Sequence, residues 1–227
     1  MDSSGHASGG RLESRPRPVT GGRGRESGVL PIDLGGSAQA LLAVPAGPAG
    51  PRPLLVFFHG AGGDAADSLA RVGELATGRG VLVLAPTSRG STWDLIAGGL
   101  GRDVAVLDAA LEQVFAQCPV DRVAIGGFSD GASYALSLGL ANGDLAEAVL
   151  AFSPGFMAPP GQAGRPRLWL THGDDDRVLP VDRCGRRVAA ELTAAGYDVT
   201  YDEFQGGHVV RADGVTAGLD WWLGAAG

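Results

Sequence analysis

Four short segments of the sequence carry residue types that could do chemistry together. In chain order they read HGAGGD at 59–64, GFSDG at 127–131, HGDDDRVLP at 172–180 and GGH at 206–208. A serine, a carboxylate and a histidine can act as nucleophile, orienting acid and base in acyl transfer. That chemistry requires the four segments to meet at one edge of the fold.

Ser129 is the candidate nucleophile. It lies at the centre of a Gly-x-Ser-x-Gly pattern, which places a serine on a sharp turn where flanking glycines allow neighbouring backbone to come close. The chain holds 38 glycines, so the pattern alone also fits an ordinary turn. Its setting, between a predicted strand at 122–126 and a helical pattern, favours a nucleophile whose oxyanion would face a helix N-terminus.

Acyl transfer also needs two donors for the oxyanion. The backbone N–H of Asp130 and that of Ala61, in the glycine-rich segment after an apolar strand, are the candidates. Residues 60–65 also match a dinucleotide-binding fingerprint, which requires an acid at the end of the next strand. That strand ends Leu-Ala-Pro at 84–86, so we expect no nucleotide and no other cofactor, and a structural role for His59.

The acid and the base come from the last two segments. Consecutive aspartates at 174–176 could be a solvated turn, a metal site or the source of an orienting carboxylate. With four histidines and no paired spacing, a metal site is not favoured. His208 follows both the serine and the aspartates, in the order Ser, Asp, His. These residues leave the choice of aspartate open.

Short apolar runs alternate with amphipathic ones along the chain. This alternation predicts an α/β fold with a mostly parallel central sheet and helices on both faces. The sites of such sheets lie at the carboxyl ends of the strands. The predicted strands are 40–44, 54–58, 81–85, 122–126, 148–152, 167–171 and 199–204, and the predicted helices are 65–77, 102–117, 132–140, 182–195 and 214–223.

Composition narrows the function further. The net charge is −7 and all 18 basic residues are arginine, which argues against nucleic-acid binding and excludes lysine chemistry. No apolar run approaches the roughly 18 residues of a membrane span, and no secretory signal is visible. We expect a cytoplasmic monomer or homodimer, with residues 1–27 a disordered leader and residues 28–227 the folded domain.

The chain from about residue 29 to 223 resembles α/β-hydrolases of the phospholipase/carboxylesterase group, which includes acyl-protein thioesterases and is related to dienelactone hydrolases. The resemblance rests on the four segments above. It implies that Asp176, four residues after the histidine of its segment, is the catalytic acid, with Asp174 as the fallback. It also maps the oxyanion donors onto Ala61 and Asp130. Dienelactone hydrolases use a cysteine where this chain has Ser129.

Only residues 153–166 connect two predicted strands at a point where many relatives insert a cap. We therefore expect no large cap domain and an open site. The walls of that site would be Trp93, Leu95, Phe156 and Met157. The alternative for Trp93 and Phe156 is that they pack in the core or against loops. The expected function is hydrolysis of small-molecule carboxylic esters of short to medium acyl chains, with thioesters also open. The alternatives are a peptidase on the same residues and a non-catalytic ligand receptor.

Overall fold

The computed structural model describes residues 4–18, 26–36, 39–48 and 50–224. Eight strands form one sheet in the order β1-β2-β4-β3-β5-β6-β7-β8. β1 and β2 are antiparallel to their neighbours, and the other strands run parallel. The strands are β1 (Gly28–Asp33), β2 (Gln39–Val44), β3 (Arg52–Phe58), β4 (Leu82–Pro86), β5 (Val120–Phe128), β6 (Ala148–Phe152), β7 (Arg167–Gly173) and β8 (Val199–Phe204).

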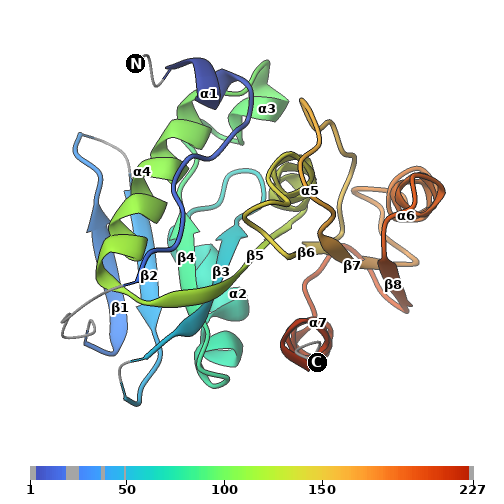
Figure 1. Ribbon diagram of the computed structural model, residues 1–227. Helices are drawn as coiled ribbons and strands as arrows, with labels where there is room; N and C mark the ends of the chain where they lie inside the picture. Colours follow the sequence, from blue (N-terminus) through green and yellow to red (C-terminus); the bar gives the residue numbers. More distant parts are fainter. Residues whose placement is uncertain (1–3, 19–25, 37–38, 49, 225–227) are drawn as a thin grey trace.

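Helices cover both faces of this sheet (Figure 1). α2 and α7 lie on one face, and α3, α4, α5 and α6 lie on the other, each layer with its own apolar core. The mostly parallel sheet between two helical layers confirms the predicted fold class. The helices are α1 (Ser4–Ser8), α2 (Ala65–Thr77), α3 (Asp94–Ala97), α4 (Arg102–Gln117), α5 (Asp130–Ala141), α6 (Gly185–Ala194) and α7 (Ala212–Gly224).

The central strands are buried on both faces, as their apolar sequences predict. All five residues of β4 and of β6 are buried, as are the last five of β3. Between β6 and β7, residues 153–166 contain no helix and only one isolated bridge, Gly143 with Gly164. The connection therefore holds no cap over the carboxyl ends of the strands.

The sequence pattern did not predict β1. Its run Val-Leu-Pro-Ile contains Pro31, which has no N–H to donate to a sheet. Proline is tolerated because β1 is the edge strand and pairs only with β2, where Pro31 lies opposite Leu41. At the edge, one side of the strand has no partner, so the N–H that proline lacks is not needed for a hydrogen bond between strands.

The N-terminal segment differs from the expected disordered leader over residues 4–18. Leu12 is 1% exposed and belongs to the core that α4 and α5 share. Its N–H donates to the side chain of Asn142, which in turn donates to the carbonyl of Gly10. Arg11 pairs with Asp144 at 2.8 Å. The single leucine carries the packing, which a composition argument over the whole segment could not foresee; residues 19–25 lie outside the described residues.

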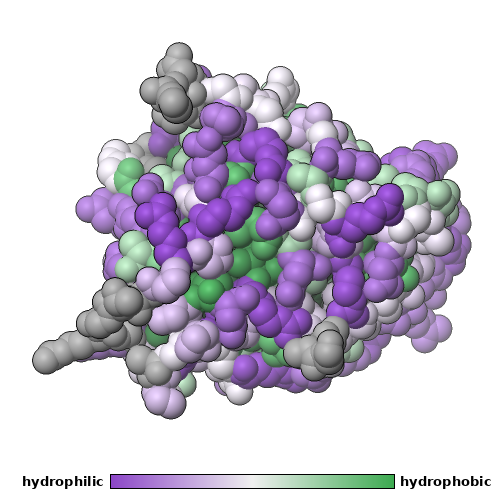
Figure 2. Space-filling view, in the orientation of Figure 1, coloured by the Kyte–Doolittle hydropathy of each residue, from purple (hydrophilic) through white to green (hydrophobic). Residues whose placement is uncertain are grey.

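The face of the molecule that Figure 2 shows is largely hydrophilic, with a smaller apolar area near its centre. Among the described residues, the exposed large hydrophobic side chains are Val29, Val178 and Val209. Within the same residues, no helix is long and apolar enough to cross a membrane.

Replacing Leu12 with alanine should lower the free energy of unfolding by about 3 kcal/mol, because the substitution leaves a cavity in a packed core. Urea denaturation followed by circular dichroism measures this loss. Arg17→Ala is the matched control, since Arg17 is an exposed residue of the same segment. Equal stability of the two variants would show that the segment does not pack against the domain.

Candidate active site

Ser129 lies on a strained turn between β5 and α5. Its backbone has φ 57° and ψ −120°, a conformation that residues other than glycine rarely adopt. The N–H of Ser129 donates to the carbonyl of Phe152 at 2.9 Å, which ties the turn to β6. The serine therefore stands at the carboxyl end of the central strand, ahead of the first turn of α5.

Two glycines make this turn possible. A Cβ on Gly127 would lie 2.3 Å from the carbonyl oxygen of Gly131, and one on Gly131 would lie 2.3 Å from that of Phe58. Real Cβ atoms do not come so close to backbone oxygen atoms. The Gly-x-Ser-x-Gly pattern is thus a packing requirement, since α5 begins in direct contact with the backbone of β3.

A chain of hydrogen bonds connects three side chains that lie far apart in the sequence. The Ser129 hydroxyl lies 2.9 Å from Nε2 of His208, and Nδ1 of the same imidazole lies 2.6 Å from Oδ2 of Asp176. With Nδ1–H donating to the carboxylate, Nε2 is left as an acceptor for the hydroxyl proton. The structure thus brings together the predicted nucleophile, acid and base.

The carboxylate of Asp176 is buried and fully engaged. Oδ1 accepts the N–H groups of Val178 and Leu179 at 2.9 and 2.8 Å, and Oδ2 accepts from His208. Burial alone would raise the pKa of Asp176, but these hydrogen bonds outweigh it and hold the pKa below its usual value. The acid is therefore an anion at neutral pH. Asp174, the fallback choice, instead accepts from the N–H of Gly206 and fixes the loop of the histidine.

His172 is a positioning residue that the sequence reasoning did not identify. Its side chain is fully buried, with Nε2 2.8 Å from the carbonyl oxygen of Leu179 and 3.2 Å from Oδ2 of Asp176. Because both neighbours are acceptors, Nε2 carries the proton. Burial lowers the pKa of His172, so the ring stays neutral. Its place four residues before Asp176 was the available signal.

The N–H groups of Ala61 and Asp130 are candidates for an oxyanion site. Among the described residues, neither has a hydrogen-bond acceptor, whereas the N–H of Gly62 donates to Ser91 at 2.7 Å and that of Gly63 to Gly60 at 3.1 Å. Asp130 opens α5, where the first N–H groups have no partner within the helix. Both unpaired donors belong to segments next to Ser129.

The loop after β4 holds this glycine-rich segment in place. The indole N–H of Trp93 donates to the carbonyl of His59 at 2.9 Å, and the N–H of Ser88 donates to Nε2 of His59 at 3.0 Å. The hydroxyl of Thr92 donates to the carboxylate of Asp130 at 2.7 Å. His59 is buried, and burial lowers its pKa. It connects the two loops as a neutral ring.

A cavity of about 360 Å³ opens beside Ser129. It is lined by Gly60, Ala61, Gly62, Gly63, Asp67, Arg71, Phe128, Ser129, Val178 and His208. The four side chains expected as its walls are not among them. Trp93 is 1% exposed and packs in the core against Phe58 and Tyr134, and Leu95 and Met157 pack partly buried against the same core. Phe156 is held beside α5 by its N–H bond to Ser133.

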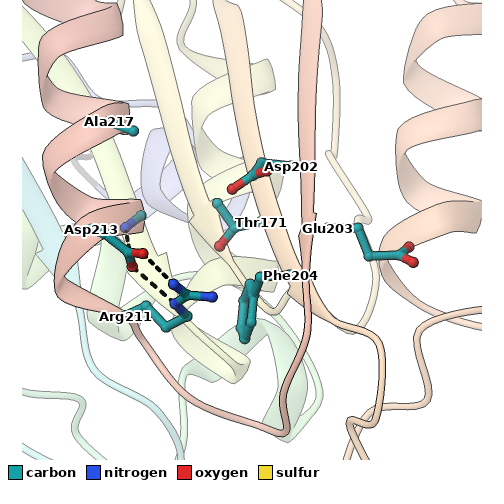
Figure 3. A pocket seen from close by; sticks show the side chains of 8 residues that line it. Thr171, Asp202, Glu203, Phe204, Arg211, Asp213 and Ala217 are labelled. Atoms are coloured by element: carbon teal, nitrogen blue, oxygen red, sulfur yellow. Dashed lines mark hydrogen bonds and ion pairs between the residues drawn. The ribbon is translucent and has the colours of Figure 1, made fainter.

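A second cavity, of about 430 Å³, lies between the ends of β7 and β8 and the start of α7 (Figure 3). Its lining includes Thr171, Phe204 and Arg211 but none of Ser129, Asp176 and His208. Figure 3 shows the guanidinium of Arg211 turned to the carboxylate of Asp213, with which it forms an ion pair. Within the described part of the chain, no cluster of three or more His, Cys, Asp or Glu side chains could hold a metal.

Comparisons with known proteins agree with this geometry. The family model described as phospholipase/carboxylesterase matches residues 104–217, half of the chain. Among solved structures, esterase PE8 is 27% identical with a TM-score of 0.65, over 81% of this chain and 98% of its own. The Bacillus cereus carboxylesterase is 18% identical with a TM-score of 0.64, over 83% and 95%.

A third similar structure is that of the fluorophosphonate-binding serine hydrolase F of Staphylococcus aureus. It is 13% identical, with a TM-score of 0.70, over 87% of this chain and 98% of its own. At this identity, and for the B. cereus enzyme, the likeness shows a shared fold. A search of curated proteins finds no match.

Because His59 and His172 are buried as neutral rings, we expect the free energy of unfolding to depend on pH. Burial lowers the pKa of His172 in the native state, so as the pH falls below about 6.5, the ordinary histidine pKa, the unfolded chain binds a proton first. The free energy of unfolding should therefore decrease from pH 7.5 to pH 5.5, by at most about 1.4 kcal/mol per pH unit for each such histidine. His59 contributes with the same sign.

Urea denaturation of the His172→Gln variant at both pH values measures how much of the change in the free energy of unfolding is due to His172. Glutamine keeps a donor for the carbonyl of Leu179 but has no proton to gain, so the pH dependence should be shallower than in the wild type. Arg17→Ala serves as the control without a change in histidines. A wild-type slope retained in His172→Gln would contradict the assignment of a buried neutral ring.

Proposed function

Since the chain belongs to the phospholipase/carboxylesterase family, we propose that it hydrolyses carboxylic esters in two steps, with Ser129 as nucleophile, His208 as base and Asp176 as orienting acid. The observation that carries this proposal is the unbroken hydrogen-bond chain from the Ser129 hydroxyl through the imidazole to the carboxylate. An esterase-type activity is also that of the solved structures to which the chain is similar.

In the first step, Nε2 of His208 takes the hydroxyl proton as Ser129 Oγ attacks the ester carbonyl. The carbonyl oxygen becomes an oxyanion, which the N–H groups of Ala61 and Asp130 stabilise. The ionised Asp176 stabilises the imidazolium that forms between them. The imidazolium then gives its proton to the leaving alcohol, and an acyl-serine remains.

In the second step, water attacks the acyl-serine. His208 takes a proton from this water, and the same two N–H groups again hold the oxyanion. Collapse of the intermediate returns the proton to Ser129 and releases the carboxylic acid. The step needs no group beyond those of the chain and a water molecule.

The cavity supports short to medium acyl chains as substrates. Its volume of about 360 Å³ is near the lower end of ordinary ligand pockets, and the short connection between β6 and β7 adds no cap to extend it. The acyl-serine mechanism accepts esters and thioesters alike, because both present the same carbonyl to Ser129.

Ser129→Ala should abolish hydrolysis of p-nitrophenyl butyrate, and Asp176→Asn should lower kcat by about four orders of magnitude by leaving the imidazole in the wrong tautomer. A fluorophosphonate probe should label the wild type on Ser129 and should not label Ser129→Ala. Ser137→Ala is the control, since Ser137 is a buried serine of α5 with no role in the reaction.

Three outcomes would contradict the proposal. Turnover retained in Ser129→Ala would exclude the nucleophile. Absence of labelling and turnover in a folded wild type would favour a ligand receptor. Cleavage of peptide substrates with a higher kcat/KM than esters would favour a peptidase.

Thr92→Val should lower kcat about tenfold with little change in KM, because the hydroxyl of Thr92 holds the residue whose N–H would face the oxyanion. Steady-state kinetics on p-nitrophenyl butyrate measures the split between kcat and KM. The control is Thr193→Val, since Thr193 is exposed on α6 and bonds only within its helix. An equal loss in both variants would mean that the Thr92 contact serves stability alone.

A further inference from the structure

Arg71 is a cation in the wall of the cavity that contains Ser129. It lies on α2, the helix that follows the glycine-rich segment, and its side chain is exposed. Arg71 is the arginine among the residues that line this cavity, which also include His208. The sequence reasoning did not select it, because it stands about two helical turns beyond the last residue of the HGAGGD segment.

The ring of Phe128 lies between Arg71 and the imidazole of His208. Its Cζ lies 4.9 Å from the centre of the Phe128 ring, and that ring lies 4.8 Å from the imidazole of His208. The guanidinium and the imidazole are therefore at most about 10 Å apart. A carboxylate at the far end of a short substrate chain can reach Arg71 while its ester carbonyl lies against Ser129.

The guanidinium has no acceptor of its own. Among the described residues, no carboxylate lies within 4.0 Å of it and no hydrogen bond from it is formed. The acid that lines the same cavity, Asp67, accepts the N–H of Asp64 in the cap of α2.

The second cavity shows the usual arrangement for comparison. There the guanidinium of Arg211 also lies against an aromatic ring, that of Phe204, at 5.2 Å. It is neutralised by Asp213, as the dashed lines in Figure 3 show. In the cavity of Ser129, the ring contact is present, but among the described residues no carboxylate forms an ion pair with Arg71; Asp67, which lines the same cavity, is held in the cap of α2.

From this geometry we infer that Arg71 binds an anionic group of the substrate, so that the esterase prefers esters bearing a carboxylate. The inference rests on the proposed function of Ser129. A guanidinium with five free N–H donors matches the two oxygens of a carboxylate, and stacking on Phe128 fixes its position at little entropic cost. The chain as a whole carries a net charge of −7, so an anionic substrate would be attracted by Arg71 itself and not by the overall charge of the protein.

Two matched pairs of esters test the inference. On the acyl side, mono-p-nitrophenyl adipate is compared with p-nitrophenyl hexanoate, which has the same chain length. On the alcohol side, 4-carboxyphenyl acetate is compared with its methyl ester. The measured quantity is the ratio of kcat/KM for the anionic ester to that for the neutral one.

In at least one pair, Arg71→Gln should lower this ratio about tenfold relative to the wild type, the effect of losing one charge-assisted contact at a partly exposed site. Arg71→Lys should give an intermediate ratio, because lysine keeps the positive charge but lacks the paired N–H donors that bind both oxygens of a carboxylate. Raising the ionic strength should lower the ratio in the wild type more than in Arg71→Gln.

The matched control is Arg102→Gln, which removes an exposed arginine of α4 that does not line this cavity. It should leave both ratios as in the wild type. Ratios that do not change in Arg71→Gln, or that change equally in Arg102→Gln, would overturn the inference. Such a result leaves the proposed function intact as long as neutral esters are hydrolysed through Ser129, whereas turnover in Ser129→Ala would contradict the proposed function itself.

Discussion

The site depends on one strained backbone conformation, the positive φ of Ser129. A residue with a side chain occupies it only because the surrounding contacts leave no alternative. Gly131 lies against the carbonyl of Phe58, and the N–H of Ser129 is held by Phe152. Neighbouring strands on both sides of β5 therefore fix the turn. The same contacts place the N-terminus of α5 beside Ser129, so a single local distortion orients both the proposed nucleophile and one of its proposed oxyanion donors.

The acid side of the site is rigid for a different reason. Asp176 has no strained backbone, and its carboxylate is held by two N–H groups of its own loop and by two histidines. The anion is thus solvated by protein donors that do not need to reorganise during the reaction. The buried His172 donates to the carboxylate as a neutral ring, and His208, which lines the cavity, also donates to it. The two rings share one carboxylate oxygen, but only His208 can reach the serine.

The sequence predicted those features that local patterns encode. The parallel strands and their helices followed from apolar runs and spacing, and Ser129 and His208 were selected from segments that each follow a predicted strand. The choice of Asp176 among three consecutive aspartates came from the family resemblance and not from the local pattern. The sequence could not predict features that depend on contacts between distant segments. β1 contains a proline that only an edge position permits, and Leu12 packs into a core to which distant helices such as α4 and α5 contribute. The sequence alone allowed Trp93 either in the cavity wall or in the core; the loop turns its ring inward, where its indole N–H donates to the carbonyl of His59.

Arg71 illustrates the same limit for specificity. On α2 it is one arginine among 18, and nothing in its local sequence distinguishes it from those that pair with acids. Its neighbour one turn earlier, Asp67, would be an ordinary partner at that spacing, but the capping box of α2 engages that carboxylate. Helix capping therefore leaves the cation without its expected partner, and the ring of Phe128, the residue before the nucleophile, holds it at the cavity. In this way the residues that start α2 and that build the turn at Ser129 also determine which charge faces the substrate.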